Sequence, residues 1–548
     1  MHDELPQDTE YNILHGTATR WLYNESLQHK LRYTPFDVDA LTDIACTRVG
    51  ATRCVSCSKF AEGAFNKVYL LEFDNGSKAV LRIPTPLIGN VELVTASEVA
   101  TTCYLWERYE GTSISQSLPP KVLAWDSSYK NPVGTPFILF ELIPGVRLLD
   151  RWDQSDLKGD NVKPMISGLA SHETMLLQEP FSQIGSIFFA EDVSEELRAR
   201  PLYRPGEEPA DNILAKRLAR KYRIGPLVDR DWWRGEYGKV DAHRGPWTDM
   251  ETMIKSAAEL QLRAMDTVVD FSSSMVKSDP SDAGLLRCML KMTIELAAIV
   301  PLDDINPKLT EPVLKHPDIS LRNLIVSPEG PANIQSIIDW QRATVVPFIM
   351  GVDLPSAISY DQSVISIPND GSPPPWPEGF GTLSHEEQEI VRFHHRLASY
   401  HQAYLKAIDE VHPLRRFVWD NSALLAIASL PHVINRCIAD GPHLLRDLLI
   451  FLQENWDTAG LGSYVACPIA FSEHEIAQHH DEENVRREYN GNVERLREDV
   501  GCRDDGAVNE EDFESSMEEL KKHREEWDED QMKGPFPMHE GAPAFPLT

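Results

Sequence analysis

The sequence has no long hydrophobic run. A helix that crosses a membrane needs about 20 consecutive, mainly apolar residues, and the longest candidate, Ala423 to Leu430, ends at Pro431. The first residues, Met-His-Asp-Glu, are acidic and match neither a secretory signal nor an Arg- and Ser-rich transit peptide. We therefore expect no transmembrane segment and no presequence.

Cysteine is scarce and scattered. Eight cysteines are spread over 548 residues, which is typical of a reducing intracellular compartment rather than of a disulfide framework. Cys54-Val-Ser-Cys57 has no second pair at zinc spacing, and His474-Glu-Ile-Ala-Gln-His479 misses the H-E-x-x-H spacing by one residue. These absences argue against a structural zinc site and against a zinc hydrolase.

Positive charge is also in short supply. The chain has 53 Lys and Arg against 85 Asp and Glu, a net charge of −32. Such a field repels phosphate backbones, so we expect no nucleic-acid partner for the molecule as a whole. Residues 481–530 alone hold 20 acidic against 8 basic side chains, and their mixed signs at helical spacing predict a solvated helix.

The rest of the composition is that of a globular protein, with 42% hydrophobic and 25% charged residues. Strand-like and helix-like patterns change along the chain and divide it into five regions. We predict a helical extension (1–60), a strand-rich region (61–145), a mainly helical region (146–470, with an insert at about 185–250), an acidic helical extension (471–530) and a disordered tail (531–548).

One stretch of the helical region carries the chemistry. It is His316-Pro-Asp318-Ile-Ser-Leu-Arg-Asn323, followed after two β-branched runs by Ile337-Ile-Asp339-Trp340. Pro, Gly and Asn between the two runs predict a hairpin, which brings Asn323 beside Asp339, with Asp318 on the loop leading in. One acid can then orient or deprotonate a hydroxyl, and two hard oxygen ligands can hold Mg²⁺. The alternative is a buried hairpin whose polar ends only cap turns.

H-x-D-x4-N followed by I-I-D-W resembles the catalytic and metal-binding loops of the aminoglycoside phosphotransferase family. This resemblance implies an α+β, protein-kinase-like fold of two lobes, a small antiparallel-sheet lobe and a larger helical one. It implies Asp318 as the catalytic base or hydroxyl orienter, His316 as the brace of its loop, and Asn323 and Asp339 as the Mg²⁺ ligands. Gln341 stands where many relatives carry Glu.

Other phrases resemble one fungal branch of that family, the branch of altered inheritance of mitochondria protein 9. They are Arg20-Trp-Leu-Tyr-Asn-Glu25, Gly185-Ser-Ile-Phe-Phe189 and Arg244-Gly-Pro-Trp247. The resemblance implies a mitochondrial location, whereas the lack of a visible presequence favours the cytoplasm.

The same resemblance places a nucleotide in the strand-rich region. In a kinase-like lobe the first strand turn covers the phosphates and the next strand supplies a cation, which here implies Gly63 and Asn66 in the turn and Arg82 as the cation. Arg82 stands in A-V-L-R, where kinases have V-A-I-K, and Glu98 on the following helix is its expected partner. The adenine would meet the backbone of the hinge, Phe140, Glu141, Leu142 and Ile143.

Two functions remain open at this point. The first is an ATP- and Mg²⁺-dependent transfer of the γ-phosphate to a hydroxyl of a small-molecule acceptor, with that acceptor and the nucleotide as partners. The second is a non-catalytic kinase-like binding or adaptor protein in mitochondrial maintenance, favoured by Arg82 and by a turn with a single glycine. The complete set of Asp318, Asn323 and Asp339 favours the enzyme, because a scaffold does not need it.

Overall fold

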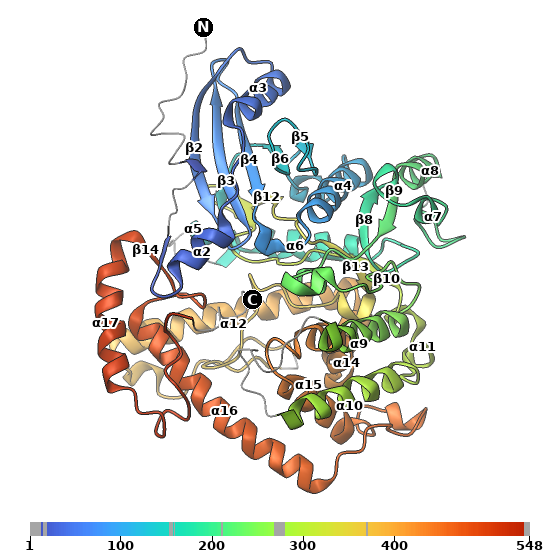
Figure 1. The fold of residues 1–548 in the computed structure, drawn as a ribbon, viewed down its shortest axis with the longest axis vertical. Coiled ribbons are helices and arrows are strands. Elements are labelled where there is room, and N and C mark those ends of the chain that lie inside the picture. Colours follow the sequence, from blue (N-terminus) through green and yellow to red (C-terminus); the bar gives the residue numbers. More distant parts are fainter. Residues whose placement is uncertain are drawn as a thin grey trace.

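The computed structural model describes residues 13–14, 19–152, 157, 159–209, 212–267, 280–368 and 371–541. A smaller lobe with an antiparallel sheet lies above a larger, mainly helical lobe (Figure 1). The predicted α+β fold of two lobes is confirmed.

The small lobe is built on a five-stranded sheet with the strand order β2-β3-β4-β6-β5. Side chains alternate between its two faces: Phe137 and Leu139 pack with the α3 side, whereas Ile138 and Phe140 pack with the α4 side. This alternation gives β6 two buried apolar faces. The elements are α3 (Val38–Val49), β2 (Cys54–Glu62), β3 (Asn66–Phe73), β4 (Lys78–Pro84), α4 (Val91–Tyr109), β5 (Val122–Asp126) and β6 (Phe137–Glu141).

The N-terminal extension differs from the prediction in two ways. It is not wholly helical, because β1 (Thr19–Trp21) precedes α2 (Glu25–Arg32). It is also shorter, because β2 begins at Cys54 and belongs to the sheet. A three-residue strand is too short to leave a period-two pattern, which is why the sequence did not reveal it.

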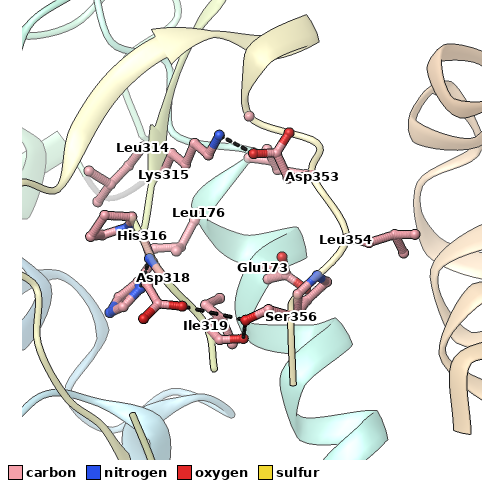
Figure 2. A pocket seen from close by; sticks show the side chains of 14 residues that line it. Glu173, Leu176, Leu314, Lys315, His316, Asp318, Ile319, Asp353, Leu354 and Ser356 are labelled. Atoms are coloured by element: carbon pink, nitrogen blue, oxygen red, sulfur yellow. Dashed lines mark hydrogen bonds and ion pairs between the residues drawn. The ribbon is translucent and has the colours of Figure 1, made fainter. Parts of the chain in front are cut away.

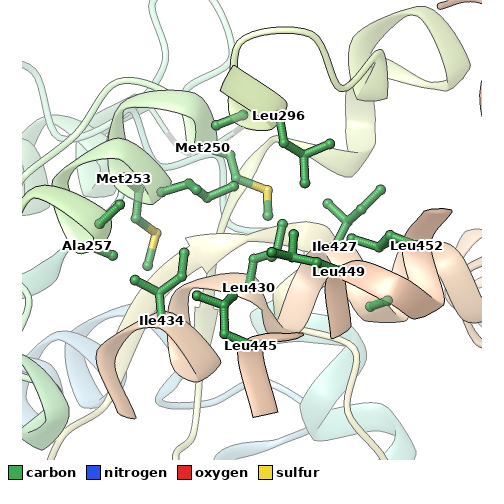
Figure 3. Close-up of a cluster of buried hydrophobic side chains, with 14 of the residues drawn as sticks. Met250, Met253, Ala257, Leu296, Ile427, Leu430, Ile434, Leu445, Leu449 and Leu452 are labelled. Carbon is green, nitrogen blue, oxygen red and sulfur yellow. The ribbon is translucent and has the colours of Figure 1, made fainter. Parts of the chain in front are cut away.

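The large lobe has a helical core in which leucines recur at helical spacing. Leu445, Leu449 and Leu452 of α15 pack against Ile427 and Leu430 of α14 (Figure 3). α14 continues through Pro431, at which the sequence suggested a stop. The helices are α6 (Lys163–Leu176), α9 (Met250–Thr267), α10 (Pro280–Ala297), α12 (His385–Val411), α13 (Pro413–Trp419), α14 (Ser422–Arg436) and α15 (His443–Asn455).

Within the described ranges, no single helix is both long enough and apolar enough to cross a bilayer. Taken together, α13 and α14 have the length and the composition of a membrane span, but they are bent by 84° relative to each other.

A small sheet in the large lobe carries the predicted hairpin. β11 (Leu324–Val326) pairs with β12 (Ile334–Ile337), and β7 (Val146–Arg147) pairs with β11 from the other side. Gly145 leads the chain into β7 with φ 141°, and a Cβ atom there would lie 2.7 Å from the Val326 carbonyl oxygen. Only glycine fits this approach, so Gly145 fixes how the chain enters the large lobe.

The two ends of the chain interlock. β1 pairs antiparallel with β14 (Ala507–Asn509), which lies between the helices α16 (Glu473–Val500) and α17 (Phe513–Glu526). In Figure 1, α16 runs along the large lobe, whereas α17 and β14 lie beside α2. The predicted acidic helices are present in the C-terminal extension, and a strand separates them.

The prediction of a disordered tail is wrong for residues 531–541. Met538 is 2% exposed in a cluster with Leu520, Trp527 and Phe536. The indole N–H of Trp527 donates to the Gly534 carbonyl oxygen at 2.9 Å. The proline-rich composition suggested disorder, but the apolar residues beside the prolines are buried against α16 and α17. Residues 542–548 lie outside the described residues.

We expect Met538→Ala to lower the stability of the C-terminal extension. Truncating a buried methionine costs about 2–5 kcal/mol of stability. His539→Ala, at the neighbouring exposed residue, is the matched control and should change stability by about 0.5 kcal/mol or less. Thermal unfolding of both variants checks this. Identical melting temperatures for Met538→Ala and wild type would show that the tail does not dock.

Candidate functional site

The open end of the hairpin brings two predicted residues together. One position beyond the paired Leu324 and Ile337, the Ile338 N–H donates to the Asn323 carbonyl oxygen at 2.9 Å. The next residue, Asp339, has φ 65°, a left-handed conformation that aspartate tolerates better than most residues. Asn323 and Asp339 therefore lie side by side at the end of adjacent strands, as predicted.

Asp318 is held in place by its neighbours. The Asn323 side-chain N–H₂ donates to both the backbone oxygen and Oδ2 of Asp318, each at 3.0 Å. Ser356 Oγ donates to Asp318 Oδ1 at 3.4 Å (Figure 2). These bonds orient the carboxylate, and they turn the Asn323 amide so that its remaining polar atom, Oδ1, can serve as a hard cation ligand.

His316 connects the Asp318 loop to the Asp339 strand. Its Nδ1 accepts the Asp318 backbone N–H at 3.1 Å, and its Nε2 lies 3.1 Å from the Ile338 carbonyl oxygen, to which it donates. Both ring nitrogens are thus occupied in the neutral tautomer. Burial lowers the pKa of His316 to about 4. These two bonds are the contacts expected of His316 as the brace of the Asp318 loop.

The ring of Trp340 packs against two buried histidines. The ring centroids of His316 and His172 lie 4.7 and 5.7 Å from that of Trp340. Burial lowers the pKa of His172 to about 3, and His316 contributes to the shift. Both histidines are therefore neutral in the folded protein at neutral pH.

These two histidines predict acid sensitivity. Their folded-state pKa values lie below the unfolded value of about 6.5, so the unfolded state takes up protons first as the pH falls from about 6.5 towards 4. Each histidine should cost up to about 1.4 kcal/mol of stability per pH unit in this window. Denaturant unfolding between pH 7 and 4 measures the slope. His172→Asn should reduce it, and the exposed His480→Asn should not.

Arg82 of β4 reaches across to the large lobe. It forms an ion pair with Glu98 of α4, the expected partner, and its Nη1 also lies 3.0 Å from Asp339 Oδ1. Burial lowers the pKa of Arg82, and Asp339 opposes this shift. The bond to Asp339 was not predicted, and it joins the small-lobe cation directly to the proposed metal ligand.

The donor atoms fit a hard cation that arrives with phosphates. Within the described part of the chain, no group of three or more His, Cys, Asp or Glu side chains could hold a metal ion. Asn323 and Asp339 supply two oxygens, and Mg²⁺ commonly takes one or two carboxylates and completes its shell with phosphate oxygens and water. Cys57 is not a candidate metal ligand, because burial raises the pKa of its thiol to about 12 and so disfavours the thiolate.

The turn between β2 and β3 is tied to the loop after Asp339. Asn66 and Gln341 exchange two amide hydrogen bonds of 2.8 and 3.1 Å. The Asn66 side chain therefore pairs with Gln341, a contact that was not predicted, and its contact with the nucleotide stays a prediction. Gly63 is not required by packing, since a Cβ atom there would meet nothing within 4 Å.

The four hinge residues differ in whether their backbones already pair within the sheet. Phe140 and Glu141 lie in β6 and pair with Val80 and Ala79 of β4. Leu142 and Ile143 follow the end of the strand, and the Leu142 side chain is 36% exposed. Of the four predicted residues, these two are best placed to meet the edge of a base.

A pocket of about 150 Å³ lies beside Asp318 (Figure 2). Lys315 pairs with Asp353 on one side of it, and Ser356 contacts Asp318 on the other. The sequence did not single out Lys315 or Ser356 as site residues, because no motif spacing marks them.

No protein-family model matches the chain. It is 27% identical over 510 residues to a subtelomeric hrmA-associated cluster protein of Aspergillus fumigatus, covering 85% of this chain and 91% of that protein. It is 26% identical over 403 residues to altered inheritance of mitochondria protein 9 of Lodderomyces elongisporus, covering 63% and 60%. The same protein of Eremothecium gossypii is 24% identical over 470 residues, with 80% and 72% covered.

Solved structures of phosphotransferases are also similar to the chain. The GDP and kanamycin complex of the phosphotransferase APH(2")-IIIa has a TM-score of 0.34 at 14% identity, covering 76% of this chain and 98% of that one. The macrolide 2'-phosphotransferase of Brachybacterium faecium has a TM-score of 0.32 at 13% identity, covering 75% and 98%. The sequence resemblance to the altered-inheritance-of-mitochondria proteins is confirmed.

Proposed function

We propose that the chain is a Mg-ATP-dependent phosphotransferase that moves the γ-phosphate to a hydroxyl of a small molecule. One observation carries this proposal: Asp318, Asn323 and Asp339 converge at the open end of one hairpin, and Arg82 reaches Asp339 from the other lobe. An acid, two metal ligands and a phosphate cation are the parts that phosphoryl transfer needs.

In the transfer, Asp318 accepts a hydrogen bond from the acceptor hydroxyl and takes its proton. The acceptor oxygen forms a bond to the γ-phosphorus while the bond from that phosphorus to the β–γ bridging oxygen breaks, and ADP leaves. Asn323 and Ser356 keep the carboxylate in position. Asn323 and Asp339 would hold Mg²⁺, which neutralises phosphate charge when bound. Catalysis then consists mainly of positioning and charge stabilisation.

Arg82 would hold the α- and β-phosphates. Its guanidinium is steadied by Glu98, which is 2% exposed, and by Asp339. A planar guanidinium meets two phosphate oxygens at once, unlike the point charge of the usual lysine. The departure from V-A-I-K therefore changes the geometry of phosphate binding and keeps its charge.

A thermal shift assay tests nucleotide binding without knowledge of the acceptor. A ligand at 100 times its Kd stabilises the folded form by about 2.7 kcal/mol, so ATP with Mg²⁺ should raise the melting temperature more than ATP with EDTA. Phosphorylated species that appear in a cell extract only with protein and Mg-ATP would then identify the acceptor. No shift with ATP under either condition would refute the proposal.

The second candidate is a binding or adaptor protein that uses the same residues without turnover. The Asn66–Gln341 bonds favour it, because they already join the turn between β2 and β3 to the loop after Asp339. Nucleotide binding without any phosphorylated product would support it. The names of the yeast relatives favour a mitochondrial location for either function, and the cytoplasm is the alternative.

A further inference from the structure

Two guanidinium groups contact one aromatic ring in the turn between β2 and β3. Phe65 lies between β2 and β3, and its ring centroid is 5.3 Å from Arg230 Cζ and 5.2 Å from Arg342 Cζ. Arg342 comes three residues after Asp339, whereas Arg230 begins the short helix η5 (Arg230–Trp232) of the insert. Three segments distant in sequence thus meet at the tip of this turn.

Nearby charges leave Arg342 without an ion pair at contact distance, although it interacts at longer range with the Asp229 carboxyl and counteracts the rise in the pKa of that group. Arg234 lies 3.6 Å from Asp231, and Arg436 pairs with Asp440. Arg230 donates to the Leu87 carbonyl oxygen at 2.9 Å. Among the described residues, no carboxylate lies within 4.0 Å of the Arg342 guanidinium, although its side chain is only partly exposed. A half-buried cation of this kind is stabilised by an anion that binds beside it.

The contacts that lead from the hinge to Arg342 indicate which anion this is. Arg82 Cζ lies 5.5 Å from the ring of Phe140, at the start of the hinge, and Arg82 also contacts Asp339. Arg342 continues from Asp339 to the turn tip, and the Asn66–Gln341 bonds hold that tip in place. The contacts therefore lead from Phe140 of the hinge to Arg82, to Asp339 and then to Arg342.

We propose that Arg342 is a ligand of the terminal phosphate of the bound nucleoside triphosphate. Phe65 holds the guanidinium in place, and the five N–H donors of arginine suit phosphate oxygens. The inference rests on the proposed function, which puts the base at the hinge and the α- and β-phosphates at Arg82. It adds a phosphate ligand for which no sequence motif gave a signal.

Calorimetric titration with two nucleotides tests the inference. In the presence of Mg²⁺, we expect Arg342→Gln to weaken binding of a non-hydrolysable ATP analogue by about 10- to 100-fold, the range of a charge-assisted hydrogen bond. Binding of ADP, which lacks the terminal phosphate, should stay at the wild-type level. Arg342→Lys should recover part of the loss. Residue 342 has φ 68°, and Gln and Lys bear the same backbone cost there, so the pair isolates the charge.

Arg287→Gln on α10 is the control, since Arg287 is a partly exposed arginine that pairs with Asp266. It should bind both nucleotides as the wild type does. Equal losses for ADP and the ATP analogue in Arg342→Gln, or no loss for either, would overturn the role of Arg342 while the proposed function stands. If the wild type binds neither nucleotide, the proposed function falls and this inference falls with it.

Discussion

Asp318→Asn is expected to slow phosphoryl transfer by about 10²–10⁴-fold and to leave the affinity for Mg-ATP close to that of the wild type. Losses of this size are typical when a positioned acid–base group is removed. The carboxylate accepts bonds from Asn323 on Oδ2 and from Ser356 on Oδ1. In the variant, the amide oxygen can still accept from Asn323, and the amide N–H₂ can donate to the Ser356 hydroxyl oxygen. The variant therefore keeps the loop but loses the group that takes the hydroxyl proton.

Asp339→Asn should fail in a different way. Asp339 contacts Arg82 and is the proposed metal ligand, so the loss of its charge should weaken Mg²⁺-dependent nucleotide binding as well as turnover. Titration of Mg-ATP into both variants separates the two roles. Asp266→Asn on α9, another exposed and ion-paired aspartate, is the control. Wild-type affinity in Asp339→Asn together with weak binding in Asp318→Asn would reverse the assignment.

The site was predictable where the determinants are local. Pro328, Gly330 and Asn333 mark the turn, and β-branched residues on both sides mark the strands. A hairpin fixes its own register, so Asn323 could be placed beside Asp339 from sequence alone. The pairing of Arg82 with Glu98 was predictable only through the resemblance, because strand and helix patterns do not specify which charges meet.

Contacts between distant segments left no sequence signal. Asn66 and Gln341 are 275 residues apart, and Trp21 and Asp505 are 484 apart. Neither pair belongs to a periodic pattern, since each depends on how whole elements pack. The Asn66–Gln341 pair and the interlock of the chain ends were not predicted for this reason.

Asp505 is the centre of that interlock. Its Oδ2 accepts from the Trp21 indole N–H at 3.3 Å and from Arg32 Nη2 at 3.1 Å. The Arg32 and Asp505 side chains are only 3% and 8% exposed. Burial lowers the pKa of Arg32, and Asp505 opposes this effect. One carboxylate thus joins β1 and α2 to the segment before β14.

The interlock connects both lobes. On one side, the Tyr69 hydroxyl of β3 donates to the Ile13 carbonyl oxygen at 2.9 Å. On the other side, Arg446 of α15 donates to the Glu475 carbonyl oxygen of α16 at 2.9 Å. The N- and C-terminal extensions therefore form a tie between the small lobe and the large lobe, outside the hinge.

Asp505→Asn should loosen this tie. Removing one partner of a buried ion pair costs about 3–5 kcal/mol, because the other charge stays buried without compensation. Hydrogen exchange is the suitable measurement, since a protein of this size need not unfold in one step. We expect faster exchange in residues 19–33 and 503–526, with the five-stranded sheet unchanged.

Glu510→Gln in the same extension is the control for this result. Glu510 lies 3.4 Å from Arg20, and its side chain is 69% exposed, so its loss should cost about 1 kcal/mol or less. Equal exchange in both variants would mean that the Arg32–Asp505 pair does not hold the extensions together. The tie would then depend on the apolar contacts of Leu22 and Tyr23 with Val508, and Val508→Ala would release the same segments.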